Sequence, residues 1–291
     1  MTNTDTDTET EKPFAPPVEN PVEDPPEGLY EPAGRVDLLP GPDAVNDEAA
    51  VFFAERGYLA VAGVLTPAEV AASLASLEDL VEGRIEGFNG VQNEAQAGDD
   101  PETPAIDRVR KLWFTGDECQ RCGMPVDHPL VKRIVAKLMP GREPAIFQTM
   151  ALLKPPGRGR EKPWHQDHAY FKVRLEDRIV GVWIALDHAL VENGCMQLID
   201  GGHLGGPLVH FSRRDWQLCD ADVMKQASLA AVLAPGDALF FDSLLPHGTP
   251  PNRSGRRRRA MQFHYAPADT VKIAMEEHDG IFGSAGKSVY C

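Results

Sequence analysis

Residues 258–265, RRAMQFHY, decide the fold of this chain. Side chains alternate between two faces in a β-strand, so this stretch presents Arg258, Gln262 and His264 on one face. The other face carries the apolar side chains of Met261, Phe263 and Tyr265. A buried guanidinium is costly unless it meets an anion. The stretch therefore predicts a strand with a hydrophobic core on one side and a polar, anion-binding cavity on the other.

Short apolar runs separated by glycine and proline surround this stretch. They occupy residues 146–153, 179–186, 196–199, 230–233, 238–241 and 260–265. Many short strands with turn residues between them are typical of antiparallel architectures in which two sheets pack together. We therefore expect a mainly β fold with flanking helices, in which a jelly-roll core, or double-stranded β-helix, occupies about residues 108–270.

Two helices are expected before the β core. Residues 46–57 start at Asn46 with acidic residues in the first turn and end at Gly57. Residues 66–82 start with TPAE, which combines an N-cap, a proline at the first helical position and a capping-box glutamate. Residues 58–65 between them have the pattern of a strand. Both helices should pack on the outside of the core.

The N-terminal segment differs in composition from the rest of the chain. The first 45 residues hold 11 acidic and 2 basic side chains, with few large apolar groups to offset the entropy lost on ordering. We expect a disordered tail over residues 1–44 and a single folded domain over residues 45–291. Within that domain, residues 87–107 are rich in Gly, Asn, Asp and Pro, which predicts either a mobile loop over the site or a plain surface connection.

Charge and hydropathy exclude several classes of partner. The formal net charge is -15, whereas nucleic-acid binding depends on clustered Lys and Arg. No apolar stretch approaches the roughly 20 residues that span a bilayer, and none follows the polar start of the chain. The five cysteines are odd in number, which argues against a disulfide framework. We expect a cytoplasmic protein with a small-molecule partner, neither nucleic acid nor membrane, and no feature fixes its oligomeric state.

A candidate metal site is divided between residues 163–168 (PWHQDH) and residues 246–249 (PHGT). His165 and Asp167 are two apart, so in a strand they point the same way and can approach one metal. His247 follows an apolar strand and precedes a glycine, where a strand end can present it to a cavity. Two histidines and one carboxylate hold iron(II) on one face and leave the opposite face open. A His-x-Asp triplet also arises by chance. A metal site is therefore expected only if His165, Asp167 and His247 converge near Arg258.

These motifs together make the chain resemble the phytanoyl-CoA hydroxylase family of iron(II)- and 2-oxoglutarate-dependent oxygenases. The resemblance covers about residues 108–270, through residues 108–111, 149–150, 154–156, 165–167, 193–195, 202–203, 247–249 and Arg258. It implies a dioxygenase that oxidises a C–H bond of a small-molecule metabolite and releases succinate and CO2. The implied cofactors are iron(II), 2-oxoglutarate and O2, with ascorbate as an optional stimulant.

The resemblance also implies roles for individual residues. His165, Asp167 and His247 correspond to the catalytic facial triad around iron. The implied co-substrate contacts are Arg258 on the far carboxylate of 2-oxoglutarate, Thr249 beside it, Lys111 where some members place a lysine, and Gln148 and Gln166. Retention of Asp167 favours hydroxylation over the halogenation catalysed by relatives that lack this carboxylate, although desaturation, epoxidation and ring closure use the same chemistry.

Residues that flank the ligand strands, or stand in the neighbouring sheet, are expected to bind substrate: Trp183, Gln197, His168, Tyr170, Phe171 and His203. Core packing explains Trp183 equally well, and His168 can merely cap a turn. Two other interpretations stay open. One is a jelly-roll protein that binds or senses a small ligand without catalysis. The other is half of a zinc site formed by Cys119 and Cys122 with His128, although no second pair lies at matching distance.

Overall fold

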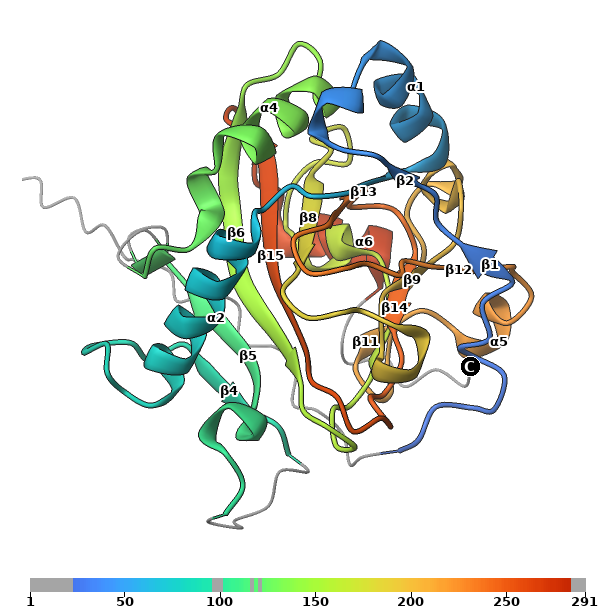
Figure 1. Cartoon of the computed structure of the whole chain (residues 1–291). Coiled ribbons are helices and arrows are strands. Elements are labelled where there is room, and N and C mark those ends of the chain that lie inside the picture. The colour runs from blue at the N-terminus through green and yellow to red at the C-terminus, as the bar shows by residue number, and fades with distance from the viewer. Residues whose placement is uncertain (1–22, 96–101, 116–117, 120–121, 284–291) are drawn as a thin grey trace, which may run out of the picture.

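A computed structural model describes residues 23–95, 102–115, 118–119 and 122–283. It contains a sheet of eight strands and a sheet of five strands, with helices on the outside of the larger one (Figure 1). The mainly β jelly-roll architecture expected from the sequence is confirmed. No helix among the described residues has the length and apolar composition needed to cross a membrane.

The larger sheet has the strand order β2-β3-β13-β8-β15-β6-β5-β4. Its strands are β2 (Leu38–Leu39), β3 (Tyr58–Val61), β4 (Val91–Asn93), β5 (Val109–Phe114), β6 (Pro144–Lys154), β8 (Val180–Ala185), β13 (Ala238–Asp242) and β15 (Arg258–Pro267). The long antiparallel pair of β15 and β6 starts with Arg258 opposite Lys154 and ends with Pro267 opposite Pro144. The apolar runs predicted at 146–153, 179–186, 238–241 and 260–265 form the middle of this sheet.

The smaller sheet has the order β1-β12-β9-β14-β7. Its strands are β1 (Gly34–Arg35), β7 (Lys162–His165), β9 (Gln197–Leu198), β12 (Leu229–Ala230) and β14 (His247–Thr249), and a separate hairpin pairs β10 (Phe211–Ser212) with β11 (Trp216–Gln217). The run predicted at 196–199 contains β9, whereas the run predicted at 230–233 overlaps β12 only at Ala230 and adds an isolated bridge between Leu233 and Ala189. This sheet carries the two candidate metal-binding histidines.

Helices surround the two sheets. They are α1 (Asp47–Arg56), α2 (Pro67–Val81), α4 (Pro129–Leu138), α5 (Asp220–Val223) and α6 (Met275–Phe282), with 3-10 turns η1 (Pro42–Ala44), η2 (Ala105–Arg108), η3 (Pro125–Asp127), η4 (Asp167–Tyr170), η5 (Val191–Asn193) and η6 (Gly202–Gly205). The two predicted helices are confirmed with their caps: the Asn46 side chain accepts from Ala49 N, and Thr66 forms a capping box with Glu69. Gly57 ends α1 in the left-handed conformation that glycine tolerates best.

The two faces of β15 behave as its sequence predicts. Met261, Phe263 and Tyr265 lie in the main hydrophobic core, which also contains buried residues of α1, α2 and α4. Arg258, Gln262 and His264 line a cavity on the opposite face. Because the apolar face is covered by helices, the polar face is left to build the site.

The expectation of disorder up to residue 44 is wrong for residues 23–44. β1 pairs with β12, and β2 extends the larger sheet beside β3. Leu29 is buried against Trp164, Leu218 and Val223, and the Tyr30 ring stacks on Trp164. A few apolar side chains suffice here because they enter a core made by the rest of the chain, which composition alone does not reveal. Residues 1–22 lie outside the described residues.

The segment 87–107, expected as a mobile loop or a plain surface connection, contains structure of its own. β4 pairs with β5 at the edge of the larger sheet, and η2 leads into β5. Gln92 of β4 lines the cavity, and Glu94 is buried. Residues 96–101 lie outside the described residues. The segment thus forms part of the cavity wall.

Candidate metal centre

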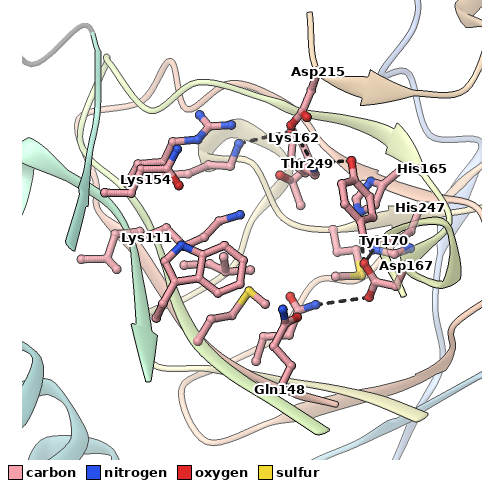
Figure 2. Close-up of a pocket in the computed structure, with 18 of the residues that line it drawn as sticks. Lys111, Gln148, Lys154, Lys162, His165, Asp167, Tyr170, Asp215, His247 and Thr249 are labelled. Carbon is pink, nitrogen blue, oxygen red and sulfur yellow. Dashed lines mark hydrogen bonds and ion pairs between the residues drawn. The ribbon is translucent and has the colours of Figure 1, made fainter. Parts of the chain in front are cut away.

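The three candidate metal ligands meet at one end of the cavity. His165 ends β7 and His247 begins β14, and the pairing of these strands puts the two histidines directly opposite each other. Asp167 comes from the first position of η4, so it reaches the site from the turn after the strand and not from the strand itself. One ligand atom from each residue lies within 4.8 Å of the other two, and all three are buried (Figure 2).

Backbone carbonyls orient both imidazoles. Nδ1 of His165 lies 2.7 Å from the Pro163 carbonyl, and Nδ1 of His247 lies 3.0 Å from the Leu245 carbonyl. A carbonyl oxygen only accepts, so each Nδ1 carries the proton and each Nε2 keeps its lone pair. Those Nε2 atoms lie 3.2 and 3.7 Å from Oδ1 of Asp167. Three lone pairs directed at one another repel unless a cation binds them, so the donor set fits a divalent metal.

Burial controls protonation at this centre. Burial lowers the pKa of His165, and burial together with the neighbouring His165 lowers the pKa of His247 to about 4. Burial opposes ionisation of Asp167, but His264 and His247 outweigh it and hold the pKa of this carboxyl well below its usual value. Neutral imidazoles and a carboxylate are the protonation states that bind metal.

The second oxygen of Asp167 is held from β15. Nε2 of His264 donates to Oδ2 of Asp167 at 2.7 Å, and the Gln262 amide donates to the same oxygen at 3.3 Å. These contacts leave Oδ1 turned toward the two histidines. Strand alternation predicts His264 and Gln262 on a polar face but gives them no role, because their partner Asp167 lies in a distant turn, η4.

Arg258 lines the same cavity. It is 2% exposed, donates to the Leu152 carbonyl at 3.3 Å and packs over the Trp183 ring at 5.4 Å. Its Nε has no partner, and no carboxylate of the described residues pairs with it. Burial lowers the pKa of this guanidinium to about 10. A buried cation of this kind needs an anion, and its planar fork fits a carboxylate.

The cavity also collects half of the other residues expected to act there. Besides the triad and Arg258, its wall includes Thr249, Lys111, Gln148, Tyr170 and Phe171. Figure 2 shows the triad and Tyr170 on one side of this space, with Lys111 and Lys154 on the opposite side. Both sheets therefore contribute to one site.

Comparison with known proteins agrees with this geometry. The family model described as "Phytanoyl-CoA dioxygenase (PhyH)" matches residues 53–260. The chain belongs to the phytanoyl-CoA dioxygenase family. It is 25% identical over 269 residues to phytanoyl-CoA dioxygenase domain-containing protein 1 of Danio rerio, covering 79% of this chain and 92% of that protein. It is also 25% identical over 240 residues to the peroxisomal phytanoyl-CoA dioxygenase of Homo sapiens, covering 76% and 68%.

Solved structures share the fold. EvdO2 from Micromonospora carbonacea var. aurantiaca, crystallised with 2-oxoglutarate, has a TM-score of 0.61 and 26% identity, covering 79% of this chain and 93% of EvdO2. The carbocyclase SnoK from nogalamycin biosynthesis has a TM-score of 0.64 and 24% identity, covering 87% and 97%. As a phytanoyl-CoA dioxygenase family member, the protein is a non-haem iron- and 2-oxoglutarate-dependent dioxygenase that uses O2.

Within this family fold, Gln166 and His168 lie outside the cavity wall, contrary to expectation. The Gln166 amide donates to the carbonyls of Gly206 and Leu244 and accepts from Leu208 N. His168 lies 2.9 Å from the Ser243 hydroxyl, and its ring packs near Phe282. Both point away from the triad: Gln166 lies at the N-cap of η4 and His168 lies within η4, and their side chains contact the segments behind the site. Gln166 and His168 thus connect η4 to the loops at residues 206–208 and 243–244.

Trp183, Gln197 and His203 are also absent from the cavity wall. Trp183 is a fully buried core residue beneath Arg258, in agreement with its core-packing interpretation. Gln197 donates to the Tyr30 carbonyl at 3.2 Å, and Nε2 of His203 lies 3.0 Å from the Ala54 carbonyl at the end of α1. These three residues flank the ligand strands in the sequence or stand in the neighbouring sheet, but their side chains do not face the cavity.

The zinc interpretation finds no support in the described residues. Cys119 and Cys122 are buried thiols in the main core, and neither forms a disulfide. Nε2 of His128 lies 3.1 Å from the Glu69 carboxylate at the start of α2. The group of described residues arranged to hold a metal is His165, Asp167 and His247.

Proposed function

We propose that this dioxygenase hydroxylates a C–H bond of a small-molecule metabolite, with release of succinate and CO2. In this proposal His165, Asp167 and His247 hold iron(II), and Arg258 binds the far carboxylate of 2-oxoglutarate with Thr249 beside it. Lys111 and Gln148 are proposed as further contacts of the co-substrate. Retention of the Asp167 carboxylate supports hydroxylation over halogenation.

One observation carries the proposal. A two-histidine, one-carboxylate donor set faces the same cavity as a buried guanidinium that pairs with no carboxylate among the described residues. The donor set fits a divalent cation, and the guanidinium fits a carboxylate. A ligand that chelates the metal at one end and ends in a carboxylate satisfies both.

The protein's own contribution is ligation, orientation and exclusion of water. Bound iron and 2-oxoglutarate supply the oxidising power with O2, and side chains decide what meets it. His264 and Gln262 fix the rotation of the Asp167 carboxylate. Tyr170 packs edge-on against the His165 ring and donates to the Trp216 carbonyl at 2.6 Å, which holds both rings in place.

Substrate is proposed to bind in the part of the cavity lined by Tyr170, Phe171, Trp113 and Met150. These side chains are mainly apolar, and such walls bind the carbon skeleton of a metabolite while a few polar groups orient it. Lys111, whose ammonium lies 4.6 Å from the Trp113 ring centre, is a polar group at this wall.

The test starts without a substrate. Under anaerobic conditions, iron(II) and 2-oxoglutarate should give the wild-type protein a visible metal-to-ligand charge-transfer band. The band and iron-dependent succinate formation should be lost in His165→Ala and Asp167→Ala. Arg258→Ala should mainly raise the 2-oxoglutarate requirement, and Arg256→Ala, an exposed arginine of the same run, serves as the matched control.

A screen for substrate-stimulated succinate release then defines the substrate class. It should cover polar metabolites and acyl thioesters, with product analysis to distinguish hydroxylation from desaturation, epoxidation and ring closure. Turnover of the His165→Ala variant at the wild-type rate would remove that residue from the proposed triad. Absence of the band from wild-type protein would contradict the proposed function as a whole.

A further inference from the structure

Lys154 is a buried basic residue beside Arg258. It is the last residue of β6 and lies directly opposite Arg258 in the antiparallel pairing with β15. Directly opposed residues of an antiparallel pair project to the same face. Both residues line the cavity, and Lys154 is 4% exposed.

The surrounding chain makes room for this lysine. A Cβ at Gly159 would lie 2.6 Å from the Lys154 Cβ, and a Cβ at Gly194 would lie 3.0 Å from its Cδ. The ammonium donates to the carbonyls of Arg160, Thr249 and Pro250, the latter two at 3.2 and 2.7 Å. All three donors are therefore used, and one of the carbonyls belongs to a residue already assigned to the co-substrate pocket.

Two basic side chains thus face one pocket. Glu161 and Glu94 act on Lys154 electrostatically, but among the described residues no salt bridge joins either of them to it. Neither Lys154 nor Arg258 pairs with a carboxylate among the described residues. Burial, followed by the charges of Arg258 and Arg110, holds the pKa of Lys154 well below its usual value. Like charges in a poorly hydrated site repel, and an anion bound there relieves the repulsion.

We propose that Lys154 is a second positive charge of the co-substrate pocket, which together with Arg258 selects a ligand that ends in a carboxylate. The inference rests on the proposed function. Through its hydrogen bond to the Thr249 carbonyl, Lys154 also positions the backbone that carries the Thr249 hydroxyl. A lysine that served only to hold the loop would affect every ligand of the metal equally. A charge acting on the far carboxylate affects only the ligands that have one.

The test compares two ligands with the same chelating end. 2-Oxoglutarate and 2-oxopentanoate share the keto acid that binds the metal, but the second ends in a methyl group. Dissociation constants are measured with iron(II) under anaerobic conditions from the charge-transfer band. Lys154→Met removes the charge and the donors, whereas Lys154→Gln removes the charge and keeps an amide donor for the carbonyls. Lys225→Met, at an exposed lysine, is the matched control.

Both variants should bind 2-oxoglutarate about tenfold or more weakly than wild type, since a nearby charge on a buried carboxylate is lost. Their affinity for 2-oxopentanoate should stay within about twofold of wild type. Equal losses for the two ligands, or an unchanged Lys154→Gln, would overturn the role of the charge. Lys154→Gln remains the folded test if the methionine variant unfolds. If wild type shows no band with 2-oxoglutarate, the proposed function has failed independently of Lys154.

Discussion

Replacing His264 by leucine should weaken metal binding although His264 is not one of the three proposed ligands. Its Nε2 donates to Oδ2 of Asp167 at 2.7 Å, which leaves Oδ1 for the metal. Leucine fills a similar space beside Phe171 and Phe241 but cannot donate. The carboxylate then loses a partner in a buried site and becomes free to rotate.

The size of the effect follows from that bond. A hydrogen bond to a charged group contributes about 1.5–3 kcal/mol, and each 1.4 kcal/mol is about tenfold in affinity. His264→Leu should therefore raise the dissociation constant of a divalent metal about 10- to 100-fold, as found for residues that orient metal ligands. Gln262→Leu should have a smaller effect of about threefold, since its 3.3 Å contact is longer.

The assay is chelator competition with manganese(II), which avoids oxidation of iron. His188→Leu, at an exposed histidine, controls for the substitution itself. Thermal melting of the metal-free variants shows whether each one is folded. A folded His264→Leu protein with wild-type metal affinity would refute the conclusion that β15 orients the carboxylate.

Three further predictions concern stability. Leu29→Ala should lower the free energy of unfolding in urea by about 2–4 kcal/mol because Leu29 is buried. The control Leu204→Ala, at a side chain 71% exposed, should change that free energy by less than about 0.5 kcal/mol. Equal losses for the two variants would show that residues 23–44 are not part of the core. Burial opposes ionisation of Asp177, but hydrogen bonds from Arg174, the backbone and Arg142 lower its pKa from 3.8 to about 2. The ionised carboxylate therefore stabilises the fold above pH 3.8, and this stabilisation is lost as the pH falls toward 2. Asp177→Asn should reduce the loss of unfolding free energy over this pH range by about 2 kcal/mol. An unchanged acid slope in urea titrations at different pH values would contradict this. Manganese(II) at a hundredfold excess over its dissociation constant should stabilise the wild-type protein by about 2.7 kcal/mol, reversibly with chelator, and should not stabilise His247→Ala; equal stabilisation of both would place the metal elsewhere.

Local signals in the sequence predicted much of the fold. The alternation in residues 258–265 identified the strand that separates core from cavity, and β15 has that arrangement. The acidic residues after Asn46 and the N-cap at Thr66 marked where α1 and α2 begin. These features are readable because strand alternation and helix capping depend on residues close together in the chain.

Contacts between distant segments could not be read in this way. Residues 23–44 were expected to be disordered, yet Leu29 enters a core whose other members lie beyond residue 160. His203 was expected to bind substrate, but its Nε2 lies 3.0 Å from the Ala54 carbonyl near the end of α1. The partner of a side chain across a sheet depends on strand order and register, which no local pattern encodes.

By itself, the sequence determined the jelly-roll class, the two faces of β15, the helix caps and the residue types of the proposed site, because each depends on short-range periodicity or on a motif. Only the tertiary structure decided that β14 lies against β7 with His247 opposite His165, that His264 holds Asp167, and that Lys154 stands beside Arg258. The physical reason is that a metal or carboxylate site is defined by distances of a few ångströms between strands, and those distances are set by pairing and packing of segments far apart in the chain.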